Sequence, residues 1–370
     1  MLKKSNFDNT RNIMQEFIPE ELSLKIDLND AIIRKLVKAS RELGKLNGIA
    51  KIIPNQAILI NALVLQEAKD SSEIENIITT HDELFLSQVN QSKMTKAAKE
   101  VRDYGRALQI GFWLIGRDKL FRNSHILAIQ KRLERNNAGF RRQSGTTIKN
   151  LNTGEIEHIP PQHYDDIVRL MSNLERYIND DSLHDIDPLI KMAMIHYQFE
   201  SIHPFYDGNG RNGRIVNILY LVYKELLDLP ILYLSGYIVK NKALYYELLQ
   251  KVRDKNAWEE WILYMLEGVS QTASNTIKII NEIKNLIANT KNILQTKEPK
   301  IYSKDFVESL FIHPYTKIDY IAERLKISRQ TASKYLKICQ ELRILTCVNI
   351  GRNKYYVNIK LFELFKKGIS

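Results

Sequence analysis

The chain has 370 residues, of which 44% are hydrophobic and 26% are charged. This balance is typical of a soluble globular protein with two or three domains. No apolar run approaches the ~20 residues that a membrane helix needs, and the polar start Met1–Asn6 does not resemble an apolar signal core. The two cysteines, Cys339 and Cys347, are too few for a disulfide framework or a cysteine zinc site. We therefore expect a cytoplasmic protein with no membrane partner.

The formal net charge of +11 is unevenly distributed along the chain. Residues 301–370 hold 13 Lys and Arg against 6 Asp and Glu, so the C-terminal part is strongly basic. This asymmetry suggests an acidic partner for that part, with nucleic acid as the first candidate. Lysine-rich surfaces are also common in proteins without such a partner, so both interpretations stay open.

Helical spacing of apolar residues dominates most of the chain. It predicts helices over 30–43, 58–78, 97–117, 125–135, 188–202, 244–249 and 257–294, with a break at Pro54. Asp187 and Pro188 are a good helix start, because the first can cap the helix and the second suits its first position. In the first helix the spacing places these apolar residues on one side: Ile32, Ile33, Leu36, Val37 and Leu43. The fold class is therefore mainly α.

One stretch has a different texture. Residues 144–149 and 155–159 are short β-prone runs on either side of a turn-like segment at 152–154, so we expect a hairpin there. The histidines show no spacing typical of a metal site. We expect His196, on an apolar helix face, to lie in the core, and His163 and His184 to lie at the surface.

The most informative stretch is the twelve residues from His203 to Arg214. Its glycines, Gly208 and Gly210, allow backbone conformations in which successive N–H groups point at one anion. Apolar residues follow from Ile215, so the stretch opens a helix whose positive end faces the same point. Arg211 and Arg214 share a face of the first turn and could clamp two phosphate groups.

Two further side chains complete a site of this kind. Asp207 offers a hard oxygen ligand that suits Mg²⁺ carried in with a nucleotide. His203 accepts a proton readily near neutral pH. Taken singly, a glycine-rich run is usually a turn and a lone histidine is usually structural. Their concentration in so short a stretch favours a site of phosphoryl or nucleotidyl transfer.

The same stretch resembles the signature of the Fic family, His-x-Phe-x-Asp/Glu-Gly-Asn-Gly-Arg-x-x-Arg, at every defined position. The resemblance implies an ATP-dependent protein adenylyltransferase, which moves AMP onto a hydroxyl of a protein side chain. It implies that His203 is the general base, that Asp207 is the Mg²⁺ ligand and that Phe205 packs inward to hold the loop. The implied phosphate-binding residues are Gly208, Asn209, Gly210, Arg211 and Arg214.

A second, shorter pattern precedes this stretch. Ser71, Glu75 and Asn76 fit the family's inhibitory pattern, Ser/Thr-x-x-x-Glu-Gly/Asn, as in its N-terminally inhibited class. Without the later signature, Glu75 would be taken for a surface carboxylate. The resemblance implies instead that Glu75 pairs with Arg214 and occupies the guanidinium that the ATP γ-phosphate requires. ATP would then bind misaligned, and the chain would hold itself nearly inactive.

The resemblance also gives the hairpin and one tyrosine a role. The hairpin is implied to be a flap that holds a target peptide by strand addition, which fixes register with little side-chain specificity. Tyr245 is a candidate contact for adenine, since a tyrosine ring can stack on the base. The complete Gly-Asn-Gly-Arg-x-x-Arg pattern favours ATP as the donor, without excluding another nucleotide.

The C-terminal part changes character near Tyr302. Apolar spacing predicts a short helix around 318–325 and a second helix, capped by Ser328, that continues to Leu342. Two β-prone runs, 345–350 and 354–357, flank residues 351–353, so the segment resembles a winged helix. The outward residues that could face DNA are Arg329, Gln330, Lys334 and Lys337. Winged helices also serve as protein-docking and dimer modules, so DNA binding and homodimer formation both stay open.

We therefore predict three regions. These are an N-terminal helical region with the inhibitory helix (1–100), a Fic-type core with a connector helix (101–297), and a winged-helix domain (298–370). The predicted function is an autoinhibited protein adenylyltransferase that uses ATP and Mg²⁺ to modify a Ser, Thr or Tyr hydroxyl of a target protein or of itself. The alternative is a DNA-binding regulator whose Fic core senses nucleotide and turns over poorly.

Overall fold

A computed structural model describes residues 16–22, 27–53, 55–89, 94–149, 154–183, 186–350 and 353–366. The predicted break at Pro54, the turn residues 152–153, His184 and residues 351–352 lie outside this part of the chain. The mainly α prediction is confirmed. The helices of the first two-thirds are α1 (Asp30–Ala50), α2 (Gln56–Ile74), α3 (His81–Val89), α4 (Lys96–Asp118), α5 (Asn123–Glu134), α6 (Tyr164–Asn179), α7 (Pro188–Ile202), α8 (Asn209–Tyr223), α9 (Ser235–Lys240) and α10 (Lys242–Lys255), with a 3₁₀ turn at Asp181–Leu183.

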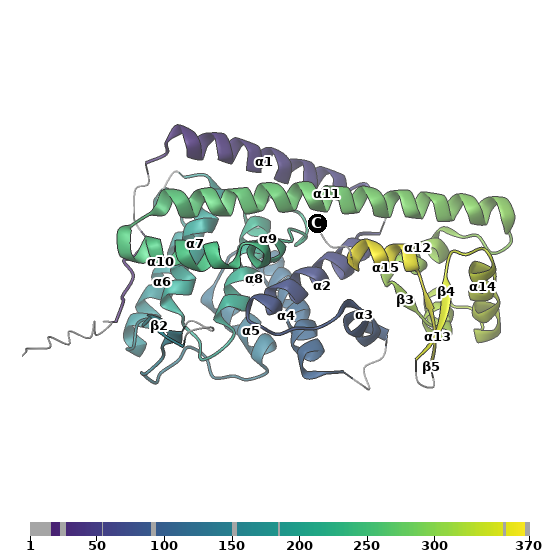
Figure 1. Ribbon diagram of the computed structural model, residues 1–370, viewed down its shortest axis with the longest axis horizontal. Helices are drawn as coiled ribbons and strands as arrows, with labels where there is room; N and C mark the ends of the chain where they lie inside the picture. Colours follow the sequence, from purple (N-terminus) through teal and green to yellow (C-terminus); the bar gives the residue numbers. More distant parts are fainter. Residues whose placement is uncertain are drawn as a thin grey trace, which may run out of the picture.

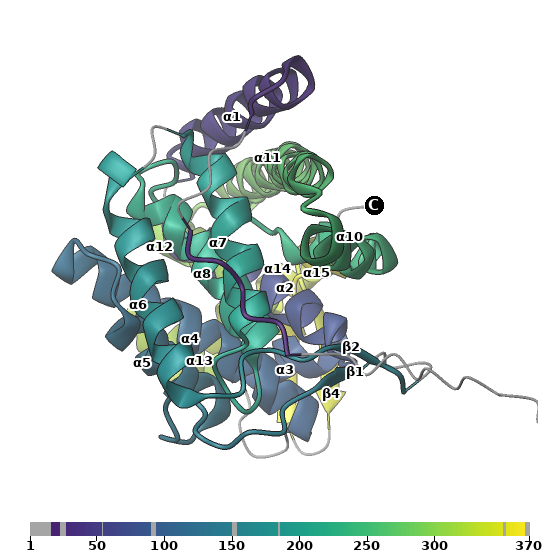
Figure 2. The same ribbon diagram turned by 90° about the vertical axis from the view of Figure 1, so that its left-hand side faces the viewer.

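Helices α7 and α8 form the centre of the molecule. Figure 2 shows them in the middle, with α5 and α6 on one side and α2 on the other. Asp187 accepts a hydrogen bond from the backbone N–H of Leu189 at 2.8 Å, and Pro188 takes the first position, as predicted. Every residue of α7 from Leu189 to Ile202 is buried, because neighbours cover the helix on all sides. The loop between these two helices is therefore held by a rigid frame.

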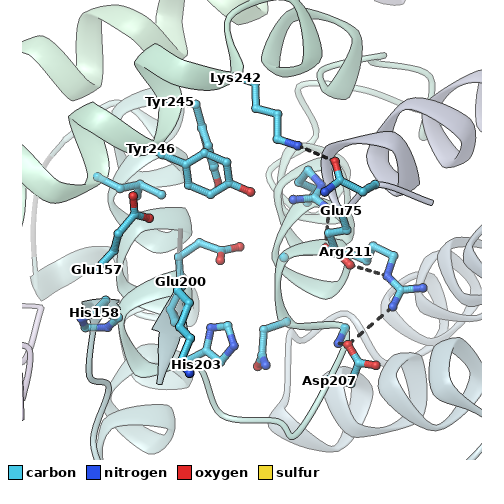
Figure 3. Close-up of a pocket in the computed structure, with 18 of the residues that line it drawn as sticks. Glu75, Glu157, His158, Glu200, His203, Asp207, Arg211, Lys242, Tyr245 and Tyr246 are labelled. Carbon is cyan, nitrogen blue, oxygen red and sulfur yellow. Dashed lines mark hydrogen bonds and ion pairs between the residues drawn. The ribbon is translucent and has the colours of Figure 1, made fainter. Parts of the chain in front are cut away.

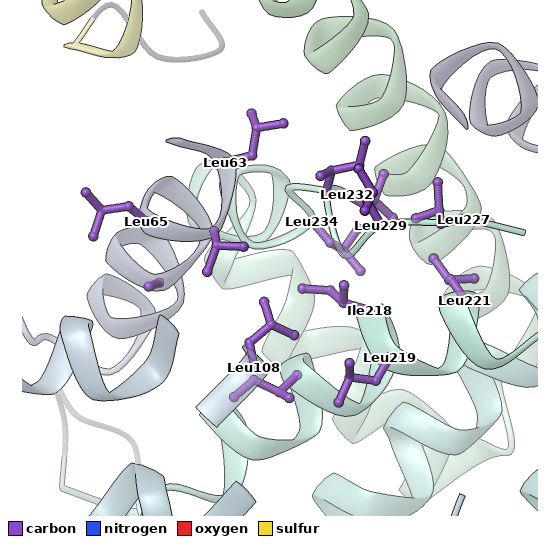
Figure 4. Close-up of a cluster of buried hydrophobic side chains, with 14 of the residues drawn as sticks. Leu63, Leu65, Leu108, Ile218, Leu219, Leu221, Leu227, Leu229, Leu232 and Leu234 are labelled. Carbon is purple, nitrogen blue, oxygen red and sulfur yellow. The ribbon is translucent and has the colours of Figure 1, made fainter. Parts of the chain in front are cut away.

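A leucine-rich cluster packs α2, α4 and α8 against the segment 227–234 (Figure 4). It combines Leu63 of α2, Leu108 of α4 and Leu219 of α8 with leucines of the segment 227–234, all of them buried. Burying each such side chain contributes roughly 1.5–3 kcal/mol, so the cluster fixes α2 firmly against α4 and α8. Helix α2 carries the predicted inhibitory residues at its other end.

A long helix, α11 (Trp258–Lys297), runs along one side of the molecule with α1 beside it (Figure 1). Its 40 residues span about 60 Å. The predicted inward face of α1 is partly wrong. Ile32 and Leu43 are buried, but Ile33 is 44% exposed and Val37 is 60% exposed. Helix α1 packs mainly on the single helix α11, so its covered stripe is narrower than the apolar pattern indicates.

The predicted hairpin is present as two short antiparallel strands, β1 (Ile148–Lys149) and β2 (Ile156–His158). Ile148 pairs with His158, whose ring Nε2 lies 3.1 Å from the carbonyl oxygen of Ser201 on α7. The hairpin is therefore attached directly beside the end of α7.

The C-terminal part contains α12 (Lys304–Ile312), β3 (Tyr315–Thr316), α13 (Ile318–Leu325), α14 (Arg329–Glu341), β4 (Thr346–Ile350), β5 (Asn353–Val357) and α15 (Ile359–Lys366). Its three strands form an antiparallel sheet in the order β3-β5-β4. This order of helices and strands fits the predicted winged helix. Ser328 caps α14 by accepting from the N–H of Thr331 at 3.1 Å, and the predicted outward residues Arg329, Gln330, Lys334 and Lys337 are exposed.

This C-terminal part packs against α2 and α3. The Asn55 side chain, at the start of α2, donates to Glu308 of α12 at 3.2 Å. Phe85 of α3 contacts the rings of Phe362 and Phe365, with centroids 5.9 and 5.8 Å apart. The start of α2 is thus anchored to the C-terminal part, while the end of α2 lies in the core.

No helix within the described ranges is both long enough and apolar enough to cross a membrane.

Candidate active site

A cavity of about 1630 Å³ opens between the end of α2, the start of α4, the β1–β2 hairpin and α10 (Figure 3). The predicted site residues His203, Asp207, Gly208, Asn209, Gly210, Arg211, Arg214, Tyr245, Glu75 and Asn76 all line it, and Ser71 lies next to it on α2. The structure thus brings together three segments of the chain, residues 71–76, residues 203–214 and Tyr245, that are apart in sequence.

The loop from His203 to Gly208 is locked by its own side chains. His203 ends α7 in a left-handed conformation, and Gly208 begins α8 with φ +71°, which glycine adopts without strain. The Asn209 side chain accepts from the N–H of Phe205 and donates to its carbonyl, both at 2.8 Å. Phe205 is buried against Phe140 and Phe199, as predicted. The side-chain amide of Asn209 therefore holds the loop in one conformation, and Asp207, Gly208 and Asn209 line the cavity.

Gly210 has no room for a side chain. A Cβ at this position would lie 2.7 Å from Glu75 Oε1 and 2.8 Å from Arg214 Nη1. The absence of a side chain lets the end of α2 approach the first turn of α8. This close approach is what brings Glu75 to the two arginines.

Arg214 is buried and held entirely by the end of α2. Its Nε donates to Ser71 Oγ at 2.7 Å, and its Nη2 donates to the Ser71 carbonyl at 2.9 Å and to Glu75 Oε1 at 2.7 Å. Burial disfavours the charge, but Glu75, Glu200 and the nearby tyrosines together outweigh this effect and raise the pKa of Arg214. The predicted pairing of Glu75 with Arg214 is present in the structure.

Glu75 also holds the second arginine, which the sequence did not predict. Its Oε2 accepts from Arg211 Nε at 2.8 Å, so one carboxylate bridges both guanidiniums. Three further carboxylates lie around Arg211, at 3.3 Å for Glu100, 3.0 Å for Glu134 and 3.8 Å for Asp207. The arginines that could bind phosphates are therefore already paired with acidic groups of the chain.

The end of α2 has a defined geometry. Glu75 caps the helix, and Asn76 follows with φ +61°, a left-handed conformation that asparagine tolerates. The Asn76 side chain accepts from Lys242 Nζ of α10 at 3.1 Å. This contact links the inhibitory pattern to the opposite wall of the cavity.

His203 faces the cavity from the end of α7 (Figure 3). Burial of the imidazole lowers its pKa to about 3, and the positive charges of Arg141 and Arg253 add to this effect. The ring is therefore neutral at physiological pH, so one of its two nitrogens carries a lone pair. Arg141 also donates from Nε to the His203 carbonyl at 2.8 Å, and so fixes the backbone of the histidine.

Asp207 lies at the mouth of the cavity with its side chain 75% exposed. Its Oδ1 accepts from the N–H of Gly208 at 2.7 Å. The carboxylate is thus oriented toward the cavity and keeps oxygen atoms accessible, which suits one protein ligand of a Mg²⁺ ion. Among the described residues, no group of three or more His, Cys, Asp or Glu is placed to hold a metal.

Tyr245 lines the cavity only marginally, because it is 1% exposed and its hydroxyl bonds His196 Nε2 at 2.8 Å. This bond agrees with the expectation that His196 is a core histidine, and His163 is exposed as expected. The neighbouring Tyr246 is 36% exposed and presents its ring to the cavity (Figure 3). Tyr246 is therefore better placed than Tyr245 to contact a base.

Sequence reasoning missed Glu200, which lies one turn before His203 on α7. The side chain is 8% exposed and points into the cavity between Tyr246 and His203 (Figure 3). Its Oε1 is buried and has no hydrogen-bond partner in the described part of the chain. Burial raises its pKa to about 7. The signal in the sequence is a carboxylate in the predicted helix 188–202, only three residues before His203.

Comparison with known protein families decides the assignment. The model described as "Fic/DOC family" matches residues 120–221, and "Fic/DOC family N-terminal" matches residues 33–113. A third model, "Protein adenylyltransferase SoFic-like, C-terminal domain", matches residues 286–361. The chain belongs to the Fic family.

Similar sequences and structures agree with this assignment. The Fic family chain is 41% identical over 59 residues to the protein adenylyltransferase Fic of Drosophila erecta and to that of Drosophila melanogaster. These alignments cover 16% of this chain and 12% of each Drosophila protein, so the chain spans only a small part of the relatives' length.

Two solved structures share the Fic fold. A Fic family protein from Desulfovibrio desulfuricans G20 has a TM-score of 0.56 at 18% identity, over 90% of this chain and 97% of that one. Fic-1 from C. elegans (residues 134–508) has a TM-score of 0.50 at 20% identity, over 68% of this chain and 73% of that one. At these identities the likeness shows the fold alone.

Proposed function

We propose that the chain transfers AMP from ATP to a hydroxyl group of a protein side chain and releases pyrophosphate. The observation that carries this proposal is the placement of a neutral imidazole, His203, beside a glycine-rich helix start and two arginines in one cavity. The Drosophila proteins that match part of the chain are named protein adenylyltransferases, which supports the same reaction.

The reaction follows from the positions of these groups. The triphosphate binds at the start of α8 beside Gly208, where the backbone N–H groups of Asn209 and Gly210 and the positive helix end stabilise its charge. Nη and Nε donors of Arg211 and Arg214 bind its outer phosphates. The target hydroxyl loses its proton to His203 as its oxygen bonds to the α-phosphorus, and the bond to the β-phosphate oxygen breaks.

Mg²⁺ would be held by Asp207 together with the phosphates, and would neutralise charge as pyrophosphate leaves. Asp207 needs its side chain at the cavity mouth for this role, and that is its position. The aspartate also accepts from the Gly208 N–H at 2.7 Å, which limits its motion.

The proposal includes self-inhibition by Glu75. Its carboxylate bonds Arg211 and Arg214 at 2.8 and 2.7 Å, the donors that the outer phosphates require. Ser71 adds two acceptors for Arg214, which keeps the guanidinium turned toward α2. Productive binding of ATP therefore requires Glu75 to leave, and the resting chain would turn over slowly.

The target is proposed to be a Ser, Thr or Tyr hydroxyl of another protein or of the chain itself. The β1–β2 hairpin borders the same cavity through Ile148, Lys149 and residues 155–158, and so lies where a target segment would pass. Strand addition to such a hairpin would hold the segment by backbone bonds.

Incubation of the purified chain with labelled ATP, alone and with lysate proteins, tests the reaction. We expect weak labelling by the unaltered chain and strong labelling by Glu75→Gly, and a fall of about 10²–10⁴-fold when His203→Ala is added to Glu75→Gly, because the general base is lost. His163→Ala, at an exposed histidine outside the cavity, is the matched control and should keep full activity. Equal labelling by Glu75→Gly and by Glu75→Gly/His203→Ala would refute the proposal.

A second function rests on the exposed face of α14. Arg329, Lys334 and Lys337 all face solvent on this helix, as readers of a DNA groove must. A regulator of this kind would shift duplex DNA in a salt-dependent way, and Lys334→Ala should weaken the shift. A shift that is absent at low salt, or that Lys334→Ala and Lys337→Ala leave unchanged, would exclude this function.

A further inference from the structure

A second, smaller hollow lies on α4 and α5, next to the active-site cavity. It encloses about 560 Å³ and is lined by Arg102, Arg106, Lys131, Arg132, Arg135, Asn136 and Asn137. Five of these side chains are cations, and the other two are amides that can donate hydrogen bonds. Arg135 lines the active-site cavity as well, so the two spaces share a wall.

The cations of this hollow outnumber their counter-charges. One buried carboxylate, Asp103, accepts from Arg132 Nη2 at 2.8 Å and from Arg135 Nε at 2.5 Å. Arg102 Nε is 3.7 Å from Asp103 and, although buried, makes no hydrogen bond with a described residue. For Arg106 and Lys131 the described residues offer no ion pair.

Arg106 shows the cost of this arrangement. Its guanidinium is only partly exposed, and burial together with the positive charges of Arg102 and Arg132 lowers its pKa. Like charges this close repel one another, and the repulsion grows as water is excluded. A bound anion would remove the repulsion and supply the missing partners at once.

We propose that this hollow binds a small inorganic oligophosphate, such as pyrophosphate. Arginine forks match the oxygens of a phosphate group with paired hydrogen bonds, and several forks around one space suit linked phosphates. The volume lies in the range of small-ligand sites. The lining holds no aromatic or aliphatic residue, so it offers no aromatic ring for a base and no apolar anchor for a docked protein segment.

The position beside the active site gives the ligand a source. The proposed transfer of AMP releases pyrophosphate into the neighbouring cavity, and Arg135 borders both spaces. The role as a holding site for this product therefore rests on the proposed function. The binding site itself does not, because it is built from residues outside the catalytic loop.

Calorimetric titration of the full chain with pyrophosphate, at constant ionic strength and without nucleotide, tests the site. We expect one saturable site, and binding at least about tenfold weaker in the double variant Arg106→Ala/Lys131→Ala. Asn136→Asp/Asn137→Asp should weaken it similarly, because it adds negative charge to the same hollow. Arg34→Ala/Lys284→Ala removes one arginine and one lysine that are exposed elsewhere, and should leave the affinity unchanged.

Two further ligands identify the chemistry. Orthophosphate should bind more weakly than pyrophosphate, and a hexaglutamate peptide should bind more weakly still. Tighter binding of the peptide would overturn the oligophosphate assignment. Equal affinity of the Arg106→Ala/Lys131→Ala variant and the unaltered chain, with matching unfolding temperatures, would overturn the site. Either result leaves the labelled-ATP experiment unaffected, so the two proposals fail separately.

Discussion

Two groups of arginines lie on either side of Arg135, and their surroundings differ sharply. In the active site, Arg211 and Arg214 are bonded to Glu75, with Glu100, Glu134 and Asp207 around Arg211. In the hollow on α4 and α5, three of the five cations lie beside a single carboxylate, Asp103, and the other two, Arg106 and Lys131, have no ion pair with a described residue. The first group is satisfied by the chain itself. The second group has fewer carboxylates than cations. Arginine side chains can therefore either pair with acidic groups of the same chain or remain available to an anionic ligand.

Replacing an arginine by alanine in the active site and in the hollow should give the largest difference in the free energy of unfolding. Arg214→Ala breaks a buried ion pair and strands Ser71 and Glu75, so we expect a loss of about 3 kcal/mol in the free energy of unfolding. Arg106→Ala relieves repulsion among cations and should change it by less than about 0.5 kcal/mol. Chemical denaturation of both variants measures the difference. Equal losses would show that the hollow is as tightly paired as the active site.

Removing the acid from the first group should make its arginines available. Glu75→Gly frees two charge-assisted contacts with Arg211 and Arg214, so transfer of AMP should rise on the order of 100-fold. Labelled-ATP incubation measures the rate. Glu73→Gln removes the charge of a neighbouring carboxylate, which is paired with Lys69, without placing a glycine in the last turn of α2, and should keep the low rate. A rapid unaltered chain that Glu75→Gly does not accelerate would contradict self-inhibition.

In the active site, Glu200 should make the free energy of unfolding depend on pH. Its pKa is raised from 4.5 to about 7 by burial, so the folded chain holds this proton over a range in which the unfolded chain has lost it. Stability therefore falls as pH rises through that range, and Glu200→Gln escapes this loss. We expect the variant to be more stable than the unaltered chain by about 2 kcal/mol at pH 8, and by much less at pH 5.

Thermal unfolding at the two pH values measures this effect. Glu282→Gln changes an exposed carboxylate on α11 and should show no such dependence. A difference that is the same at pH 5 and pH 8 would mean that Glu200 is ionised throughout.

The smallest effect should come from removing the Ser71 hydroxyl, which accepts a hydrogen bond from Arg214. Ser71→Ala removes the acceptor of the 2.7 Å bond from Arg214 Nε, while the Ser71 carbonyl continues to accept from Nη2. We expect a loss of about 1 kcal/mol in the free energy of unfolding and a slight rise in transfer. Ser72→Ala is the matched control, because Ser72 Oγ bonds only the Ala68 carbonyl of its own helix. A larger rise in transfer from Ser72→Ala would contradict the role of Ser71.

Much of this architecture could be predicted from the sequence, because the informative features are local. The helix starts at Asp187 and Ser328 depend on neighbouring residues, and the structure confirms both. The stretch from His203 to Arg214 contains both the loop and the start of α8, so the sequence alone predicted that these residues lie together. The exposure of Ile33 and Val37 could not be predicted, because it depends on how much of α1 its partner covers.

The rest of the site is assembled from distant segments, and spacing carries no information about it. Glu100 and Glu134 reach Arg211 from two other helices, so no local pattern announces them. The choice between Tyr245 and Tyr246 depends on which ring the aromatic cluster around Trp261 buries. The hollow on α4 and α5 likewise needs two helices to be laid side by side.

The location of Glu75 at the C-cap of α2, directly after Ile74, has a mechanical consequence. The end of this helix is closed by backbone bonds of 3.0 Å from Glu75 and Ile77 to the Ser72 carbonyl and from Asn76 to Glu73. Fraying of this last turn would move the Glu75 carboxylate away from Arg211 and Arg214. The rest of α2 would stay in place, because Leu63 is buried in the core and Asn55 bonds Glu308. Terminal turns open far more readily than whole helices shift. Under the proposed self-inhibition, Glu75 could therefore leave the two arginines while the rest of the active site keeps its structure.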